Sequence, residues 1–315
     1  DTLYMGDLVE PLGFDSIWAT EHYGSAYSMQ PNPLQYLSYW AGRTSRVDMG
    51  TAVIVAPWWN PVRLAHEISM LDILLKGRRL HLGIGRGIAP HEYASLGYPL
   101  EESHKYFYDV IRAIKAADGS ERFEFEGDVY KIPPTTIRPQ ARHKGDLTTR
   151  IKVAFTTETS AKLAAENGLG QMFVSGDNLD DMTNQVQRFN KIRHGLGLPP
   201  DQPTTLLWMY CAETSAEAEE GWEYFYNQLR AAQHHYFEWN NPGFEGIHGY
   251  EEYLKRQTAD VGTADASFAA RRGTQPIGTP QEIIDRIKAM QQAMSMETVV
   301  AVSYTHLTLP TNREV

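Results

Sequence analysis

An arginine enclosed by glycines is the residue of this chain best placed to bind an anion. It ends the segment NPVRLAHEISMLDILLKGRRLHLGIGRG, in which the apolar residues of 61–75 recur at three- and four-residue intervals and those of 80–84 alternate. These patterns predict an amphipathic helix followed by a strand. Arg86 comes next, between Gly85 and Gly87. Small neighbours let an anion approach the backbone while the guanidinium binds it with two hydrogen bonds. The pattern indicates a phosphate contact at the carboxyl end of a parallel strand.

A second place suited to phosphate is the hydroxyl-rich sequence TTETS at 156–160, which follows a predicted strand and opens a predicted helix. Thr157 and Ser160 stand where unpaired backbone N–H groups and the positive end of the helix dipole favour an anion. Taken alone, these residues are more often a plain N-cap of the helix. Together with Arg86 at another strand end, the phosphate interpretation becomes the stronger one.

A carboxylate and an imidazole stand together in the sequence WATEHY, just after the predicted strand 14–20. Histidine titrates near neutral pH and can act as a general base when a neighbour fixes its tautomer. Histidines are more often structural or solvated, but the position at a strand end favours a catalytic role for His22, with Glu21 beside it.

Aromatic residues flank these positions. Tyr23 follows His22, and Trp58 and Trp59 follow the next predicted strand. They suit the wall of a substrate pocket, or equally a packed strand end. No histidine or carboxylate spacing in the chain suggests a metal site, and GIGRG is not the dinucleotide-binding fingerprint.

The elements that must position these residues alternate along the whole chain. Predicted strands cover residues 14–20, 46–56, 80–84, 150–156, 170–175, 204–212 and 296–302. Predicted helices cover residues 33–42, 61–75, 106–117, 158–167, 179–195, 215–237 and 280–293, and a β-hairpin covers 122–132. Repeated βα units with apolar strands indicate a parallel sheet covered by helices. We therefore predict an α/β fold, a (β/α)₈ TIM barrel whose first strand and last helix lie outside this sequence.

Residues 1–302 are expected to form this one barrel domain. The last thirteen residues, SYTHLTLPTNREV at 303–315, differ in character and resemble the translation of a sequencing adapter. We expect this tail to be an artefact with no native role.

Composition narrows the classes of partner. The 315 residues carry a formal net charge of −10, which argues against nucleic acid or an anionic membrane as the main partner. No apolar run reaches the roughly 18 residues of a membrane span. Cys211 is the single cysteine, so no intrachain disulfide is possible and a reducing compartment, the cytoplasm, is expected.

These residues resemble the bacterial luciferase family of flavin-dependent monooxygenases. Five motifs carry the likeness in order: GFDSIWATEHY, MGTAVIVAPWWNPVRLAHEISMLD, GRRLHLGIGRG, VAFTTETSAKLAAENG and PIGTPQEIIDRI. The resemblance implies a luciferase-like (β/α)₈ barrel that binds FMN, or in some branches a deazaflavin, at the carboxyl face. Residues 240–277 correspond to the segment that closes over the site in that family.

The resemblance also implies a role for individual residues. Arg86 corresponds to the arginine that holds the flavin phosphate, and Thr157 and Ser160 to hydroxyl contacts with the same phosphate. His22 corresponds to a histidine implicated in proton transfer, and Glu21 precedes it as in the family.

Two further positions correspond to the surroundings of the flavin ring. Ala52-Val53 corresponds to a non-prolyl cis peptide that bulges beneath the isoalloxazine. Gly85 stands where luciferases proper carry a reactive cysteine, which argues against light emission but not against flavin chemistry.

The leading hypothesis is a two-component monooxygenase that takes reduced FMN from a separate flavin reductase and uses O₂ to oxidise a small organic substrate. A deazaflavin-dependent reductase or dehydrogenase on the same barrel is the first alternative. A non-catalytic flavin-binding subunit is the second. Barrels of this family commonly form homodimers or heterodimers, and the same is expected here.

Overall fold

The computed structural model describes residues 2–24, 28–155, 157–174, 178–231, 241–247, 250 and 271–302. The tail at 303–315 and much of the stretch 240–277 lie outside these described residues, as does Thr156. The chain divides into two compact units. The amino-terminal unit comprises Thr2–Val153 and Tyr236–Glu251, and the carboxy-terminal unit comprises Asp1, Ala154–His235 and Glu252–Val315.

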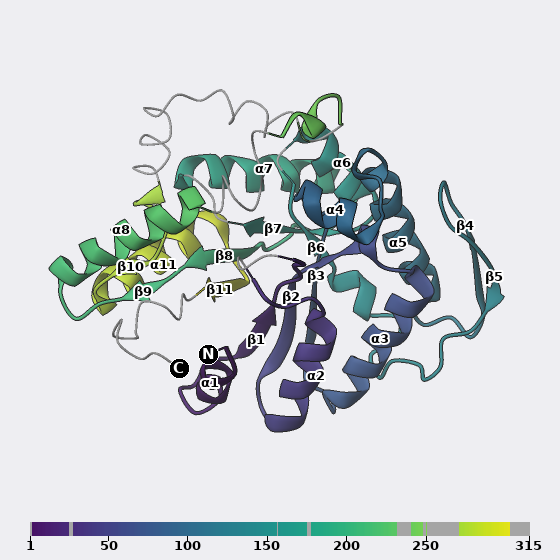
Figure 1. The fold of residues 1–315 in the computed structure, drawn as a ribbon, viewed down its shortest axis with the longest axis horizontal. Coiled ribbons are helices and arrows are strands. Elements are labelled where there is room, and N and C mark those ends of the chain that lie inside the picture. Colours follow the sequence, from purple (N-terminus) through teal and green to yellow (C-terminus); the bar gives the residue numbers. More distant parts are fainter. Residues whose placement is uncertain are drawn as a thin grey trace. The chain divides into compact units, whose positions relative to one another are not determined.

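The amino-terminal unit is built on parallel strands in the order β1-β2-β3-β6, with helices along one side (Figure 1). Its strands are β1 (Ser16–Ala19), β2 (Asp48–Val55), β3 (Leu80–Gly85) and β6 (Lys152–Val153). Its helices are α1 (Thr2–Val9), α2 (Pro33–Arg43), α3 (Pro61–Leu74), α4 (Pro90–Leu96) and α5 (Ser103–Ala117). The predicted hairpin is present as β4 (Phe123–Glu126) and β5 (Lys131–Thr135), which pair antiparallel.

Local sequence signals fix the two ends of α3 and therefore the place where β3 begins. The side chain of Asn60 accepts hydrogen bonds from Val62 N and Arg63 N, and Pro61 occupies the first turn, so α3 begins sharply. The helix ends where Gly77 adopts a φ of 101°, a conformation that favours glycine. Strand β3 follows at once, with its apolar residues buried against the helices.

The carboxy-terminal unit repeats the arrangement with parallel strands in the order β7-β8-β11. These are β7 (Gly170–Val174), β8 (Thr204–Trp208) and β11 (Thr298–Val302). The helices are α6 (Glu158–Glu166), α7 (Leu179–Gly195), α8 (Ser215–Ala231) and α11 (Pro280–Met294). Its core joins strands and helices through Phe173, Met182, Val186, Leu207, Met290, Met294 and Met296.

Three predicted boundaries need correction. The strand predicted at 204–212 is two strands, because after Trp208 the chain leaves β11 and β9 (Tyr210–Cys211) pairs with β10 (Ile277–Gly278) in a separate two-stranded sheet. The strand predicted at 150–156 has only the two residues of β6, preceded by a 3-10 turn at Leu147–Arg150. Helix α4 and the 3-10 turn Leu100–Glu102 were not predicted, since both are too short to show a helical period.

Within the described residues, the sets β1-β2-β3-β6 and β7-β8-β11 together hold seven parallel strands, the number expected from the sequence, and β9 and β10 form a further parallel pair. None of the helices in the described ranges has both the length and the apolar character needed to cross a bilayer. The same ranges contain no group of three or more histidine, cysteine or acidic side chains arranged to hold a metal ion.

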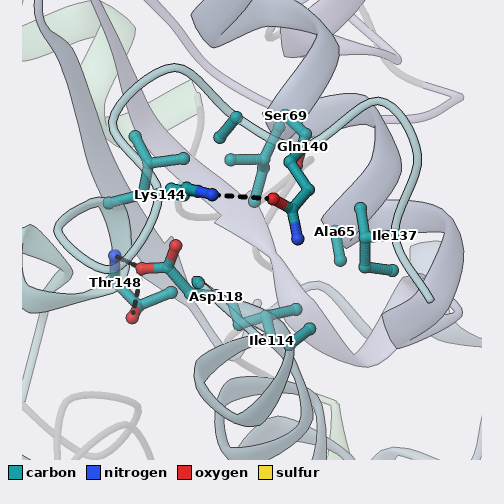
Figure 2. Close-up of a pocket in the computed structure, with 13 residues that line it drawn as sticks. Ala65, Ser69, Ile114, Asp118, Ile137, Gln140, Lys144 and Thr148 are labelled. Carbon is teal, nitrogen blue, oxygen red and sulfur yellow. Dashed lines mark hydrogen bonds between the residues drawn. The ribbon is translucent and has the colours of Figure 1, made fainter. Parts of the chain in front are cut away.

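One small cavity lies in the amino-terminal unit between α3, α5 and the loop that precedes β6 (Figure 2). Its volume is about 30 Å³, room for one or two water molecules. Polar pairs border it: Lys144 donates to Gln140, and Asp118 accepts from the amide and hydroxyl of Thr148 (Figure 2). A cavity of this size holds neither a flavin nor an organic substrate.

Candidate functional site

The carboxyl half of β2 departs from regular pairing with β3. Thr51 pairs with Leu82 and Ile54 with Ile84, so the two residues 52–53 face a single residue of β3. The peptide bond between Ala52 and Val53 is cis, as the family resemblance implies. The hydroxyl of Thr51 donates to Gly83 O at 2.8 Å, which ties β3 to the start of the bulge. The bulge is therefore an extra residue inserted next to the strand end that carries Arg86.

Val53 projects from this bulge onto Gly85. A Cβ atom added at Gly85 would stand 2.5 Å from Val53 Cγ2, closer than real Cβ contacts. The absence of a side chain at position 85 is thus matched to the valine opposite. A cysteine at this position would require Val53 to move, which explains in packing terms why a glycine stands there.

Glu21 is buried at the end of β1 and accepts three kinds of hydrogen bond. Val55 N–H donates to it at 2.7 Å, the Trp59 indole N–H at 2.9 and 3.0 Å to its two oxygens, and the Tyr23 hydroxyl at 3.1 Å. Burial raises the pKa of Glu21 to about 8, although these donors act in the opposite direction. This carboxylate joins the ends of β1 and β2 and holds Trp59 in place.

His22, next in the chain, contacts a different carboxylate. Its Nδ1 lies 3.4 Å from Glu92 Oε1, and the same oxygen accepts from Tyr23 N at 2.6 Å. Glu92 stands in the first turn of α4 and is 1% exposed. A buried carboxylate beside an imidazole is the usual way to orient a histidine that transfers protons. The structure thus places Glu92 against the ring of His22.

The predicted aromatic residues lie in this part of the unit. Tyr23 packs edge-on against Trp58, with ring centroids 5.4 Å apart, and Trp58 packs in the same manner against Tyr93 at 5.5 Å. Trp58 is 9% exposed, and nothing in the described part of the chain accepts a hydrogen bond from its indole N–H. Trp59 is more deeply buried and donates to Glu21.

Two tyrosines hold the chain at Arg86, one close to it in the sequence and one far from it. The Tyr93 hydroxyl donates to the Arg86 carbonyl, and the Tyr250 hydroxyl donates to the Gly87 carbonyl at 2.7 Å. The guanidinium carbon of Arg86 lies 4.2 Å from the centre of the Tyr250 ring. Burial raises the pKa of Tyr93 well above its usual range, so its hydroxyl stays a donor.

Thr157 and Ser160 belong to the carboxy-terminal unit, whereas Arg86 belongs to the other. Thr157 is the N-cap of α6: its hydroxyl oxygen accepts from Ser160 N at 3.2 Å, and the two hydroxyl oxygens are 2.9 Å apart. Both hydroxyls lie at the helix start as predicted. Their convergence with Arg86 on one phosphate stays a prediction.

Sequence reasoning missed three residues of this site: Glu92, Tyr93 and Tyr250. A signal existed for the first two, because Pro90, four residues after Arg86, predicts a helix start whose first turn carries them. No local pattern could point to Tyr250, since 163 positions separate it from its partner Gly87.

A family model described as luciferase-like monooxygenase matches residues 1–296 of the chain. The chain belongs to this family. Relatives of the chain include a flavin-dependent monooxygenase and an F420-dependent dehydrogenase, and the family gives this protein the coarse identity of an oxidoreductase.

Two relatives illustrate the range of cofactors that similar proteins use. The oxygenase component of the flavin-dependent trigonelline monooxygenase of Acinetobacter baylyi is 27% identical over 292 residues, covering 89% of this chain and 76% of that protein. The F420-dependent glucose-6-phosphate dehydrogenase of Kineococcus radiotolerans is 32% identical over 178 residues, covering 54% of this chain and 51% of that protein.

Two solved structures show the fold. The monooxygenase RslO1 of Streptomyces bottropensis superimposes with a TM-score of 0.74 at 25% identity, covering 95% of this chain and 84% of that one. The oxygenating constituent of 3,6-diketocamphane monooxygenase from Pseudomonas putida, in complex with FMN, gives 0.72 at 19% identity, covering 98% and 87%. The predicted luciferase-like TIM barrel is confirmed.

Proposed function

We propose that this protein is the oxygenase component of a two-component monooxygenase that receives reduced FMN from a separate flavin reductase. One atom of O₂ enters a small organic substrate and the other leaves as water. The trigonelline monooxygenase relative, which matches most of the chain, supports this assignment. The single cysteine supports a cytoplasmic location, and a homodimer or heterodimer is the assembly we expect.

The observation that carries the proposal is the shape of the β2–β3 edge. The bulge at Ala52-Val53 faces Gly85, and Arg86 follows directly on the same strand. A flat ring system suits the surface that the bulge and Val53 form, and an arginine directly after the end of β3 suits the phosphate of the same ligand. Reduced FMN, when bound, supplies the electrons for the reaction with O₂.

The residues then have the following proposed roles. Arg86 binds the phosphate, and Thr157 and Ser160 bind it from the start of α6. Ala52, Val53 and Gly85 shape the surface beneath the ring. His22 moves a proton at its imidazole, and Glu92 holds that ring; Glu21 keeps the ends of β1 and β2 together.

A buried polar atom supports a ligand next to these groups. The indole N–H of Trp58 is buried and unpaired among the described residues, and burying a donor without an acceptor costs free energy. A polar atom of a bound ligand would satisfy it. We propose that Tyr23, Trp58 and Trp59 line the substrate side of the site, the first two by direct contact.

The second candidate is a deazaflavin-dependent dehydrogenase, favoured by the likeness to the F420-dependent glucose-6-phosphate dehydrogenase. The two candidates differ in their need for oxygen. The test supplies the protein with reduced FMN under ¹⁸O₂, or with reduced F420 without oxygen, and a panel of aldehydes, ketones, sulfonates and ring compounds.

We expect ¹⁸O in a product only with reduced FMN. Turnover with reduced F420 in the absence of oxygen, or reduction of oxidised F420 by an alcohol in the same assay, would contradict the monooxygenase proposal and support a deazaflavin-dependent reductase or dehydrogenase. The matched control is His22→Ala, which should bind FMN normally and form labelled product about 10²-fold more slowly.

A further inference from the structure

We propose that Tyr250 is a positioning residue that orients the Arg86 guanidinium for the phosphate of the cofactor. This inference rests on the proposed function, because it assigns Tyr250 a role only through Arg86. Tyr250 belongs to the same compact unit as Arg86, although it follows it by more than 160 residues in sequence. Two contacts made by this side chain carry the argument.

The first contact is between the ring and the cation. The Tyr250 ring centre lies 4.2 Å from the guanidinium carbon, within the range of a cation–π interaction. Contact with the flat face of a guanidinium uses none of its N–H donors, which lie in the plane. Phosphate binds to that planar edge with paired hydrogen bonds. A ring over the central carbon therefore orients the group while it leaves the N–H donors at the edge of the guanidinium for an anion.

The second contact fixes the backbone that carries Arg86. The Tyr250 hydroxyl donates to the Gly87 carbonyl at 2.7 Å, and the Tyr93 hydroxyl donates to the Arg86 carbonyl. Two consecutive carbonyls are thus held by two buried tyrosines, each 1% exposed. Gly87 has a φ of 75°, a conformation that favours glycine, so the chain turns sharply just where it is held.

Tyr250 is itself firmly supported. Its ring stacks on Phe244, with centroids 5.5 Å apart and an angle of 14° between the planes, and Phe244 is fully buried. Because the segment with Phe244 and Tyr250 must be packed in place for Arg86 to be oriented, anion binding and the packing of this segment favour each other. Such coupling is reciprocal by thermodynamic necessity.

The test compares FMN with riboflavin, which has the same ring system and no phosphate. The ratio of their dissociation constants reports the phosphate contact, while riboflavin affinity reports whether the rest of the site is folded. The ratio is measured by quenching of flavin fluorescence for the wild type, Tyr250→Leu, Tyr250→Phe, Arg86→Ala and the double variant. Tyr108→Leu, which removes another buried tyrosine of this unit, is the matched control.

We expect Tyr250→Leu to reduce the preference for FMN about tenfold, the effect of losing an oriented cation, with riboflavin affinity within about twofold. Tyr250→Phe keeps the ring and should retain most of the preference. In the Arg86→Ala background, Tyr250→Leu should change the preference no further, because it acts through the arginine. Tyr108→Leu should leave the preference unchanged.

The outcomes separate this inference from the proposed function. If Arg86→Ala removes the preference and Tyr250→Leu does not, the positioning role is wrong and the phosphate assignment stands. If Arg86→Ala leaves the preference intact, both are wrong. An additional loss from Tyr250→Leu in the Arg86→Ala background would show that Tyr250 acts otherwise than through Arg86. Should the leucine variant fail to fold, Tyr250→Met makes the same comparison with a longer side chain.

Discussion

Two histidines of the amino-terminal unit contact buried carboxylates, and their surroundings differ. His143 Nδ1 lies 2.7 Å from Asp72 Oδ1, and the backbone N–H of His143 donates to the other oxygen of Asp72 at 2.8 Å. His22 Nδ1 lies 3.4 Å from Glu92, whose shortest bond is to the backbone of Tyr23 at 2.6 Å. Asp72 and Glu92 are equally buried.

This comparison shows that contact with a buried carboxylate does not by itself identify a catalytic histidine. Asp72 uses both oxygens on one residue and so ties the loop before β6 to α3, a structural role. Glu92 holds the backbone beside the histidine and leaves the ring at a longer distance. Hydrogen bonds of proton-transferring groups are often long before the ligand binds. Position at the carboxyl end of β1, near the bulge and Arg86, distinguishes His22.

The largest effect is expected from removing each imidazole in turn. His22→Ala should lower turnover by about 10²-fold or more, the usual contribution of a positioned general acid or base, with FMN affinity unchanged. His143→Ala should leave turnover per folded molecule close to that of the wild type. Steady-state rates normalised to bound FMN make the comparison. Equal losses in the two variants would contradict the assignment.

Removing the carboxylate of Asp72, which pairs with His143, should lower the stability of the fold. Asp72→Ala leaves the backbone N–H of His143 buried without its acceptor, so the free energy of unfolding should fall by about 1–3 kcal/mol. Urea denaturation measures this change. Turnover at a temperature where the variant is folded should be unaffected, and a specific loss of turnover would show that the pair is not merely structural.

The carboxylate beside His22 should respond in the opposite way. Glu92→Gln keeps an oxygen that accepts from Tyr23 N. The free energy of unfolding should therefore change by less than about 1 kcal/mol. Loss of the negative charge next to the imidazole should lower turnover about tenfold, since a charged partner stabilises the protonated ring. Steady-state turnover and urea denaturation, measured on the same preparation, test these two expectations. Normal turnover in Glu92→Gln would contradict the claim that Glu92 assists His22.

The last prediction concerns Glu21, another buried carboxyl group of this unit. Burial raises its pKa from 4.5 to about 8. The folded protein therefore holds this proton more tightly than the unfolded chain, and the resulting stability is complete below about pH 4.5 and is lost as pH rises through about 8. Relative to Glu21→Gln, the wild type should lose stability across this range. Parallel curves of stability against pH would contradict the raised pKa.

Much of this architecture could be predicted from the sequence because its signals are local. Asn60 and Pro61 begin α3, Gly77 follows its end, and the apolar alternation of 80–84 marks β3. The phosphate contact proposed for Arg86 was inferred from the same segment. The bulge at 52–53 has no local signature, and it was expected only from the family resemblance.

The remaining features depend on contacts between distant segments. Glu92 meets Tyr23 across 69 positions and Tyr250 meets Gly87 across 163. Composition and period carry no information on such pairings, so the sequence placed Glu21 beside His22 but did not identify Glu92 as a partner of the imidazole. It likewise could not foresee that β9 leaves the main ladder, since Trp208–Cys211 reads as one apolar strand.

A crystal structure of the FMN complex tests the central claim most directly, by the position of the phosphate. The account predicts phosphate oxygens within about 3 Å of both the Arg86 guanidinium and the hydroxyls of Thr157 and Ser160, with the ring against the Ala52-Val53 bulge. A phosphate bound away from Arg86, or a flavin away from the bulge, would contradict it.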